Sequence, residues 1–436
     1  MITIPNECYY IIFNNFRRDY KSLFSCALVN RQWCRIIIPI LWSEPGQNLK
    51  DQRLIRTFIL MLNAEEQTLL IPFKITFLRH PKPLFEYTRY IISINSHFYI
   101  GIKNWLPYNR HEIRSELENA VKCSLIKMLL RTSKCLKYLY LDEIICNPLI
   151  FENLYKNSTI ISIDLCLTYN ISNNFKSKAI DGLIKILNKN STLTSLNLRS
   201  ILLGTKEMKV LLEALYKNSV LNSLGLCYIG KEEEKMLAKF LCKSTTLTSL
   251  SIHGNNRGLL LYSYPGLEGG KVLADALCKN NTLKKLNLQY NKLGPELGKA
   301  LANALCNNTT LTSLNLGSNN LGLGGGTALA DSLCKNTTLT SLDLSGNYLG
   351  SEGGKVVADA LCENSALKDL SLHYNFLGSE GGKALANALC MNTTLISLNL
   401  SDNDLGSEGV NVLADALALN IAILIAIKDD RNYGLT

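Results

Sequence analysis

The chain has 436 residues, of which 47% are hydrophobic and 19% are charged. This composition is typical of a globular protein and excludes a disordered or fibrous chain. No apolar stretch approaches the roughly 18 residues that span a bilayer, and the first residues lack the basic start and apolar run of a secretory signal. We therefore expect neither a membrane anchor nor secretion.

The net charge of +10 is distributed unevenly along the chain. Residues 1–135 contain 19 Lys and Arg against 10 Asp and Glu, whereas residues 136–436 contain 27 against 26. The near-neutral C-terminal part does not indicate a nucleic-acid surface, and we do not expect nucleic acid as a partner. The basic excess upstream fits either an acidic partner or a solvated helical face, and we favour the second interpretation.

Apolar residues in the first 45 positions recur at helical spacing. One set lies between Cys8 and Phe16, and a second lies between Val29 and Ile37. About 40 residues bury too little surface to be securely stable alone. Docking to a partner would therefore stabilise this segment.

Five sequence elements of this segment resemble the F-box family. They are, in chain order, Ile4-Pro5, Glu7, Ile12-Phe13, Val29-Asn30-Arg31-Gln32-Trp33 and Leu41-Trp42. The departures are Ile4 in place of leucine, and Cys8 and Tyr9 where leucines are usual. The alternative interpretation is a generic amphipathic helical cap on the residues that follow.

The F-box resemblance implies three short helices that bind the Skp adaptor of a cullin-based ubiquitin ligase. Carried over to this chain, the adaptor-facing set contains Ile4, Pro5, Ile12, Phe13, Val29 and Trp33. For some of these side chains the alternative is a place in the internal core of the F-box.

Residues 46–135 are predicted to form a helical connector that caps the region downstream. Apolar residues from Leu54 to Leu62 and from Leu117 to Leu129 have the spacing of amphipathic helices. Four prolines, at positions 72, 81, 83 and 107, interrupt the middle of the segment.

The C-terminal part repeats every 28 residues, because the same phrase opens at Leu283, Leu311, Leu339, Leu367 and Leu395. In the repeat at Leu339, Leu342 and Leu344 alternate with Ser341 and Asp343, which is strand periodicity, and Lys355–Cys362 has helical spacing. A unit this short cannot bury its own apolar face, so copies must stack into a solenoid. Such a solenoid offers a long surface, which predicts a binding protein.

This pattern resembles the leucine-rich repeat in its 28-residue, ribonuclease-inhibitor-like form. The resemblance implies an α/β fold, a curved solenoid over residues 136–436 with a parallel sheet inside and helices outside. It also implies a bend asparagine whose side chain satisfies backbone groups; Asn255, Asn291, Asn319, Asn347, Asn375 and Asn403 fit, whereas Ile144, Thr168, Ile201 and Ile229 depart from it. The ten expected strand starts are Leu136, Ile160, Leu193, Leu221, Leu247, Leu283, Leu311, Leu339, Leu367 and Leu395.

We therefore predict three domains: an all-α F-box over residues 1–45, the connector over residues 46–135, and about ten repeats over residues 136–436. Ile421–Ile427 resembles a half-repeat, which would cap the open core of the solenoid.

Six of the 14 cysteines occupy one place in successive repeats: Cys242, Cys278, Cys306, Cys334, Cys362 and Cys390. Neighbouring helices lie about 8–10 Å apart, beyond the ~7 Å between Cα atoms that a disulfide spans, and a zinc ion needs four ligands together. We predict buried free thiols, a reducing compartment and no metal site.

Two further repeated features have structural interpretations. The Asn-x-Thr triplets at Asn280, Asn308, Asn336 and Asn392 predict turns from helix to strand rather than glycosylation sites. The recurring glycines, as at residues 350–354, predict a tight entry into each helix rather than a phosphate-binding loop.

The exposed strand positions vary between repeats, whereas the framework leucines do not. Tyrosine is favoured at binding hot spots, so a concave recognition surface is one interpretation, and an ordinary solvated sheet face is the other. The predicted substrate-binding residues are Tyr228, His253, Lys285, Tyr290, His373 and Tyr374. The insert at residues 257–264 either contacts a ligand or folds back on its repeat.

The five histidines are scattered, with no carboxylate or nucleophile at a telling spacing, so we expect neither an enzyme nor a cofactor. The two resemblances together imply a cytoplasmic or nuclear substrate-recognition subunit of an SCF-type ubiquitin ligase, whose partners are the Skp adaptor, the cullin scaffold and an unknown protein substrate. The alternative is a protein-binding scaffold or inhibitor of the ribonuclease-inhibitor type.

Overall fold

The computed structural model describes residues 4–17, 19–75, 83, 86–106, 111–142, 148–167, 173–227, 229–254, 270–419 and 424–426. The chain divides into two units, unit 1 over residues 1–197 and unit 2 over residues 198–436. Unit 1 therefore holds the predicted F-box, the connector and the first repeats, and the three-domain division remains a prediction. No helix in the described ranges is both long enough and apolar enough to cross a bilayer.

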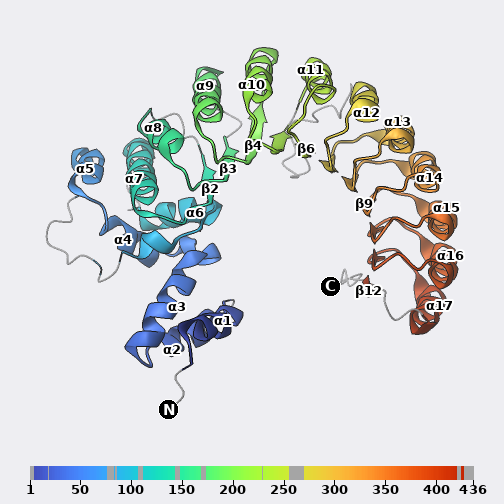
Figure 1. Cartoon of the computed structure of the whole chain (residues 1–436), viewed down its shortest axis with the longest axis horizontal. Helices are drawn as coiled ribbons and strands as arrows, with labels where there is room; N and C mark the ends of the chain where they lie inside the picture. Colours follow the sequence, from blue (N-terminus) through green and yellow to red (C-terminus); the bar gives the residue numbers. More distant parts are fainter. Residues whose placement is uncertain are drawn as a thin grey trace. The chain divides into compact units, whose positions relative to one another are not determined.

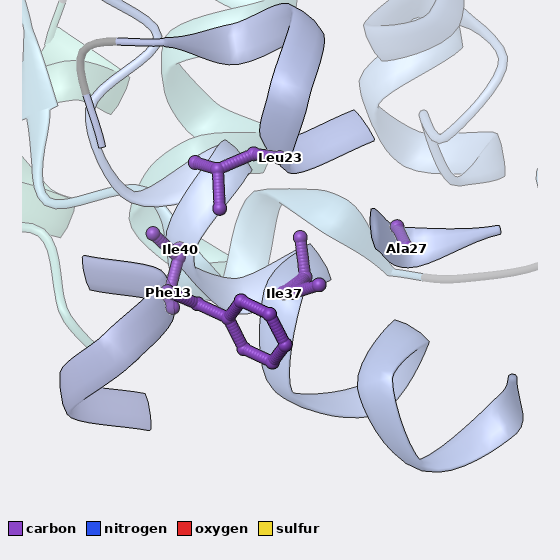
Figure 2. Packing of buried hydrophobic residues seen from close by; sticks show 5 residues of the cluster. All are labelled: Phe13, Leu23, Ala27, Ile37 and Ile40. Atoms are coloured by element: carbon purple, nitrogen blue, oxygen red, sulfur yellow. The ribbon is translucent and has the colours of Figure 1, made fainter. Parts of the chain in front are cut away.

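Three helices form the N-terminal module, which we define as residues 4–43. They are α1 (Asn6–Asn15), α2 (Tyr20–Ala27) and α3 (Arg31–Ser43). Asp19 caps α2 by accepting a hydrogen bond from the backbone N–H of Ser22, and Asn30 caps α3 through the N–H of Trp33. Figure 2 shows the small core between the helices, made of Phe13, Leu23, Ala27, Ile37 and Ile40.

Helices continue through the predicted connector. They are η1 (Gly46–Lys50), α4 (Gln52–Ile59), α5 (Ala64–Gln67), η2 (Thr68–Phe73), η3 (Tyr87–Tyr90), α6 (Ser96–Trp105) and α7 (His111–Thr132). The two predicted amphipathic helices are confirmed by α4 and α7, whose core-facing residues, such as Phe58 and Leu125, are buried. The sequence did not predict the short strand β1 (Ser93–Ile94), which pairs in parallel with the first repeat strand.

A buried carboxylate, that of Glu66, joins α5 to α7 within the connector. Glu66 caps α5 by hydrogen-bonding its own N-cap residue, Asn63, and it also accepts two hydrogen bonds from the Arg131 guanidinium on α7 at 2.7 and 3.0 Å. Because its side chain is only 1% exposed, the charge would be costly without these partners.

All ten expected repeat strands are present, and each begins two residues after the start that the sequence predicts. They are β2 (Tyr138–Leu141), β3 (Ser162–Cys166), β4 (Ser195–Leu202), β5 (Ser223–Cys227), β6 (Ser249–His253), β7 (Lys285–Asn287), β8 (Ser313–Asn315), β9 (Ser341–Asp343), β10 (Asp369–Ser371) and β11 (Ser397–Asn399). Within unit 2, neighbouring strands from β5 onward pair in parallel. The predicted α/β solenoid is confirmed.

One helix follows each repeat strand. The helices are α8 (Pro148–Lys156), α9 (Asn173–Lys189), α10 (Thr205–Lys217), α11 (Lys231–Leu241), α12 (Gly270–Lys279), α13 (Gly294–Asn307), α14 (Gly322–Leu333), α15 (Gly350–Glu363), α16 (Gly378–Met391) and α17 (Gly406–Leu419). Figure 1 shows that in unit 2 the helices lie along the outer side of the strands. The last strand, β12 (Leu424–Ala426), lies within the predicted half-repeat and pairs with β11.

The leucines of each strand point into the core, as their alternation predicts. Leu342 and Leu344 are each 1% exposed, whereas Ser341 and Asp343 are half-buried on the other face of the sheet. On the helix that follows, Val357 and Leu361 are buried four residues apart. Sheet and helix therefore share one continuous apolar layer within each repeat.

Buried asparagines at the bend after each regular strand form a ladder. The Asn347 side-chain N–H group donates to the backbone oxygens of Leu344 in its own repeat and Leu316 in the preceding one, each at 2.9 Å. Its side-chain oxygen accepts the backbone N–H of Asn319 at 3.0 Å. The same amide donation recurs at Asn291, Asn319, Asn375 and Asn403. The predicted role of these residues is confirmed.

Two earlier repeats whose bend lies within the described ranges lack this side-chain donor at the corresponding place. Ile201 and Ile229 are buried there and offer no side-chain hydrogen bond. Asn255, Ile144 and Thr168 lie outside the described residues.

A second asparagine ladder connects each helix from α12 to α16 with the strand that follows it. Asn336 donates to the backbone oxygen of Leu305 at 2.8 Å and accepts the N–H groups of Thr338 and Leu339 at 3.0 and 2.8 Å. Equivalent buried side chains are Asn280, Asn308, Asn364 and Asn392. The Asn-x-Thr triplets are therefore structural turns, as predicted.

Glycine opens the regular helices for a steric reason. Gly350 has φ +69°, a left-handed conformation that favours glycine. Four residues later, a Cβ on Gly354 would lie 3.1 Å from the Cα of Gly381 in the next repeat. The predicted tight entry into each helix is confirmed.

Candidate functional site

The N-terminal module divides the predicted adaptor-facing residues into two groups. Ile4, Pro5, Ile12 and Val29 are exposed. Phe13 is only 3% exposed and belongs to the core, which is the alternative that the sequence left open for some of these side chains (Figure 2).

Trp33 also faces inward, for a geometric reason. Its ring packs edge-on against Phe13 with the ring centroids 5.0 Å apart, and Tyr9 contacts both rings. Trp33 is half-buried, so only part of its ring is accessible. Its main role in the structure is to hold α3 against α1.

The sequence reasoning missed most of the exposed apolar surface of this module. Leu28 is 72% exposed, and several other large apolar side chains on α1, α2 and the following turn face solvent. The full set is Ile4, Tyr10, Ile11, Ile12, Phe16, Tyr20, Phe24, Leu28 and Val29, which we call the module's apolar face. A hydrophobic stretch such as Tyr9–Phe13 could have indicated it, because one face of a single helix turn cannot bury five consecutive apolar residues.

The repeat surface holds five of the six predicted substrate-binding residues within the described part of unit 2. His253 ends β6, Lys285 begins β7, and His373 follows β10. Tyr228 and the insert at residues 257–264 lie outside the described residues. No observation tests whether any of these side chains binds a substrate.

The two predicted tyrosines lie in the loops after the strands, not on the strands. Tyr290 and Tyr374 have φ values of +62° and +54°, so each adopts a left-handed conformation that is uncommon for a bulky residue. Both side chains are exposed. Three repeats separate them, which is roughly 14 Å at the usual spacing of neighbouring strands.

The two histidines have different surroundings. A ring nitrogen of His253 lies 3.0 Å from the Ser251 hydroxyl. Burial, and then the positive charge of Arg199, lowers the pKa of His253. His373 lies beside an acid, with Nδ1 3.4 Å from an oxygen of Asp402.

Two exposed aromatic residues in the loops of neighbouring repeats were not predicted from the sequence. Tyr348 and Phe376 are 54% and 44% exposed, and their rings stack with centroids 5.8 Å apart and planes 14° apart. Tyr374 packs against Phe376 at 5.2 Å. We call Tyr348, Tyr374 and Phe376 the aromatic cluster. The internal comparison could have found it, because the other regular repeats hold Lys292, Asn320 and Asp404 at the position of Tyr348 and Phe376.

The cysteine ladder does not lie where it was predicted. Cys242, Cys278, Cys306, Cys334, Cys362 and Cys390 are all free and exposed, so the prediction of buried thiols is wrong. Each follows a buried leucine at the end of its helix, where one further residue turns the side chain away from the core. Cys334 is exposed as a residue, but its sulfur is partly buried, and this partial burial together with the neighbouring Glu363 raises the pKa of the thiol, which disfavours the reactive thiolate.

No cluster of three or more His, Cys, Asp or Glu side chains in the part of the chain that the structure describes could hold a metal ion. A buried charge cluster does occur in unit 1, where Lys122 lies 2.7 Å from Glu118 and 2.6 Å from Asp142. Because the lysine faces these two carboxylates and is almost fully buried, the cluster serves to join α7 to the end of β2.

Comparison with known families identifies the repeats. The family model described as Leucine Rich repeat matches residues 279–302, 307–330, 335–358, 363–386 and 392–414. These matches coincide with the repeats that carry the asparagine ladder. No F-box family model matches the N-terminal module. No curated protein sequence matches the chain.

Three solved structures are similar to parts of the chain. The yeast Rad7 and Elc1 complex is 18% identical, with 72% of this chain and 76% of that chain covered and a TM-score of 0.46. The leucine-rich repeat-containing protein LegL7 from Legionella pneumophila is 24% identical, with 66% and 91% covered and a TM-score of 0.44. Leiomodin-1 actin-binding site 2 is 22% identical, with 36% and 91% covered and a TM-score of 0.32. Likenesses of this strength carry no argument about function, and the conclusion is that the chain contains leucine-rich repeats.

Proposed function

We propose that this protein recruits a substrate protein to a cullin-based ubiquitin ligase. In this proposal the N-terminal module docks to the Skp adaptor and the leucine-rich repeats bind the substrate. The protein supplies no chemistry of its own, and it acts by raising the concentration of the substrate near the catalytic partner. The free thiols of the described cysteines support an intracellular setting, cytoplasmic or nuclear.

The apolar face of the module carries this proposal. A module with five buried core residues exposes nine large apolar side chains, up to Leu28 at 72%. Large exposed apolar side chains in this number on a small module are typical of interaction sites on soluble proteins. The five F-box-like sequence elements favour the Skp adaptor as the partner that covers this face.

The repeats support the substrate-binding half of the proposal. Their framework needs no partner, because the leucines are buried within the stack and both asparagine ladders hydrogen-bond backbone groups of neighbouring repeats. The opposite face of the sheet is therefore free to vary, and it carries different side chains in each repeat. Solenoids use such a surface to bind other proteins.

The test measures binding of a purified Skp adaptor to the full-length chain. Ile12→Ala together with Val29→Ala removes exposed apolar contacts and leaves the core intact, so we expect adaptor affinity to fall by about tenfold or more. Trp33 is a poor choice for this test, because its replacement would also damage the core.

The matched control is Asn14→Ala together with Lys21→Ala, two exposed polar residues of α1 and α2, which should bind the adaptor like the unmodified chain. Absence of adaptor binding by the unmodified chain, or full binding by the Ile12 and Val29 variant, would contradict the proposal. A scaffold or inhibitor of the ribonuclease-inhibitor type would then be the better interpretation.

A further inference from the structure

The aromatic cluster is not required by the repeat fold. Tyr348, Tyr374 and Phe376 have φ values of +57°, +54° and +57°. The same two loop positions hold Ser318 and Asn320 in one other regular repeat, Tyr290 and Lys292 in another, and Asp402 and Asp404 in a third, all at positive φ, while Gly346 precedes Tyr348 in its own repeat. Because Asn and Gly adopt this conformation at lower cost than bulky residues, the framework itself would favour them.

The cluster also exposes its rings instead of burying them. The three side chains are 44–54% exposed, although they contact one another. A strained backbone that holds exposed aromatic rings in a fixed arrangement points to a binding role rather than to a packing role. The remaining question is which kind of group the rings bind.

The charged residues near the cluster indicate which kind of group the rings bind. The strand-and-loop segments 341–349, 369–377 and 397–405 contain no lysine or arginine, and three of their four aspartates, Asp343, Asp402 and Asp404, lie at a strand end or in a loop on the side of the aromatic cluster. The fourth, Asp369, begins β10 at the opposite end, next to Lys368. The equivalent segment 285–293 contains Lys285 and Lys292 and no acid, and segment 313–321 has no charged residue. The predicted substrate surface therefore has a basic end and an acidic end, separated by a neutral repeat.

The acids lie next to the rings by the symmetry of the repeat. Asp402 and Asp404 occupy, one repeat later, the positions of Tyr374 and Phe376. An Asp402 carboxylate oxygen also lies 3.4 Å from Nδ1 of His373, the one histidine of these three segments. Lys368 lies at the opposite end of β10 from the aromatic cluster. Neighbouring strands lie about 4.8 Å apart, so a planar cation stacked on the rings would reach these carboxylates.

We propose that the aromatic cluster and the adjoining aspartates bind an arginine-containing, extended segment of a partner protein. A guanidinium group is planar, stacks on aromatic rings, and donates paired hydrogen bonds to a carboxylate. A lysine ammonium provides the charge and a weaker cation–π contact but lacks the planar face and the paired donors, and a neutral side chain provides no charge. This inference rests on the proposed function, because it names the class of substrate segment that the repeats would recognise.

The test uses three fluorescent peptides with the full-length chain: (Gly-Arg)4, (Gly-Lys)4 and (Gly-Gln)4. We expect the arginine peptide to bind most tightly, the lysine peptide more weakly, and the glutamine peptide not to bind measurably. Affinity for the arginine peptide should fall as salt rises. Equal binding of the arginine and lysine peptides would overturn the guanidinium assignment, and equal binding of all three would overturn the role of charge.

The variants locate the site. Tyr374→Ser together with Phe376→Asn copies Ser318 and Asn320, which the fold already accepts at the same positions, and it should weaken the arginine peptide about tenfold. Asp402→Asn should weaken it as well, without removing an aromatic ring. The control Lys292→Asn, in a loop at the basic end, should not weaken it. Unchanged affinity in both cluster variants would overturn the proposal.

The same proteins separate this inference from the proposed function. Capture of the Skp adaptor should be the same for the unmodified chain and for the Tyr374 and Phe376 variant. Loss of peptide binding with retained adaptor capture is the expected result. Peptide binding without any adaptor capture would contradict only the ubiquitin-ligase proposal.

Discussion

The N-terminal module and the regular repeats use their apolar residues in different ways. In the module, five residues are buried while nine large apolar side chains face solvent. In the repeat at Leu339, the framework leucines at 339, 342, 344 and 349 are all at most 2% exposed. The comparison teaches that the repeats bury their apolar side chains by stacking on one another, whereas the module leaves apolar surface for another molecule.

The largest expected effect lies in the small core of the module. Phe13→Ala should lower the free energy of unfolding of α1–α3 by about 3–5 kcal/mol, because few neighbouring side chains can fill the cavity. Hydrogen exchange of the backbone amides of these helices measures the loss. Ile12→Ala, one residue earlier and exposed, should have little effect on exchange. Equal protection in both variants would remove the distinction between the core and the apolar face.

In the repeats, Leu344→Ala should cost about 2–5 kcal/mol, because the leucine is fully enclosed between sheet and helix. Ser345→Ala should cost less than about 1 kcal/mol, since its hydroxyl bonds to Asp343 and Ser371 on the half-exposed face. Chemical denaturation of the full-length chain compares the two. A larger effect at Ser345 would mean that the facing of the strand is reversed.

The asparagine ladder should contribute somewhat less than a core leucine. Asn347→Ala removes the side-chain oxygen that accepts the buried backbone N–H of Asn319, and a buried unsatisfied group costs about 1–3 kcal/mol. Asn303→Ala, on the exposed face of α13, is the matched control and should be close to neutral. Similar denaturation midpoints for the two variants would show that the ladder does not stabilise the stack.

Partial burial of His253 should make the free energy of unfolding fall at acidic pH. Its pKa in the folded protein lies below the ordinary 6.5, so the unfolded chain binds the proton more readily. The contribution of the neutral imidazole is complete above about pH 6.5 and is lost as the pH falls below that value toward the lowered pKa. Denaturation curves for His253→Gln should therefore fall less steeply with acid than those of the unmodified chain. A steeper fall would contradict the assigned direction.

The smallest effect is expected at the exposed thiols. Cys306→Ser should change stability by no more than about 0.5 kcal/mol, as is usual for surface substitutions. Iodoacetamide should label Cys306 in the native protein and leave the buried Cys123 unlabelled. Protection of Cys306 in the native state would restore the original prediction of a buried ladder.

Periodicity alone determined the fold of the repeats. A strict 28-residue period with alternating leucines leaves one way to bury them, so strand starts, strand facing and both asparagine ladders followed from the sequence. The F-box-like segment was also predicted as helices, because its apolar residues have helical spacing. Helical spacing is a local feature, and the repeat pattern is visible because one sequence contains several copies of the same 28-residue unit.

Tertiary packing decided what local spacing could not. Phe13 and Ile12 are adjacent apolar residues, and only the packing of α3 against α1 buries the first and exposes the second. Cys306 follows a buried leucine, but the end of its helix turns it outward. The aromatic cluster joins side chains from two repeats through left-handed loops, and its contacts follow from the stacking distance between coils rather than from any one phrase of sequence.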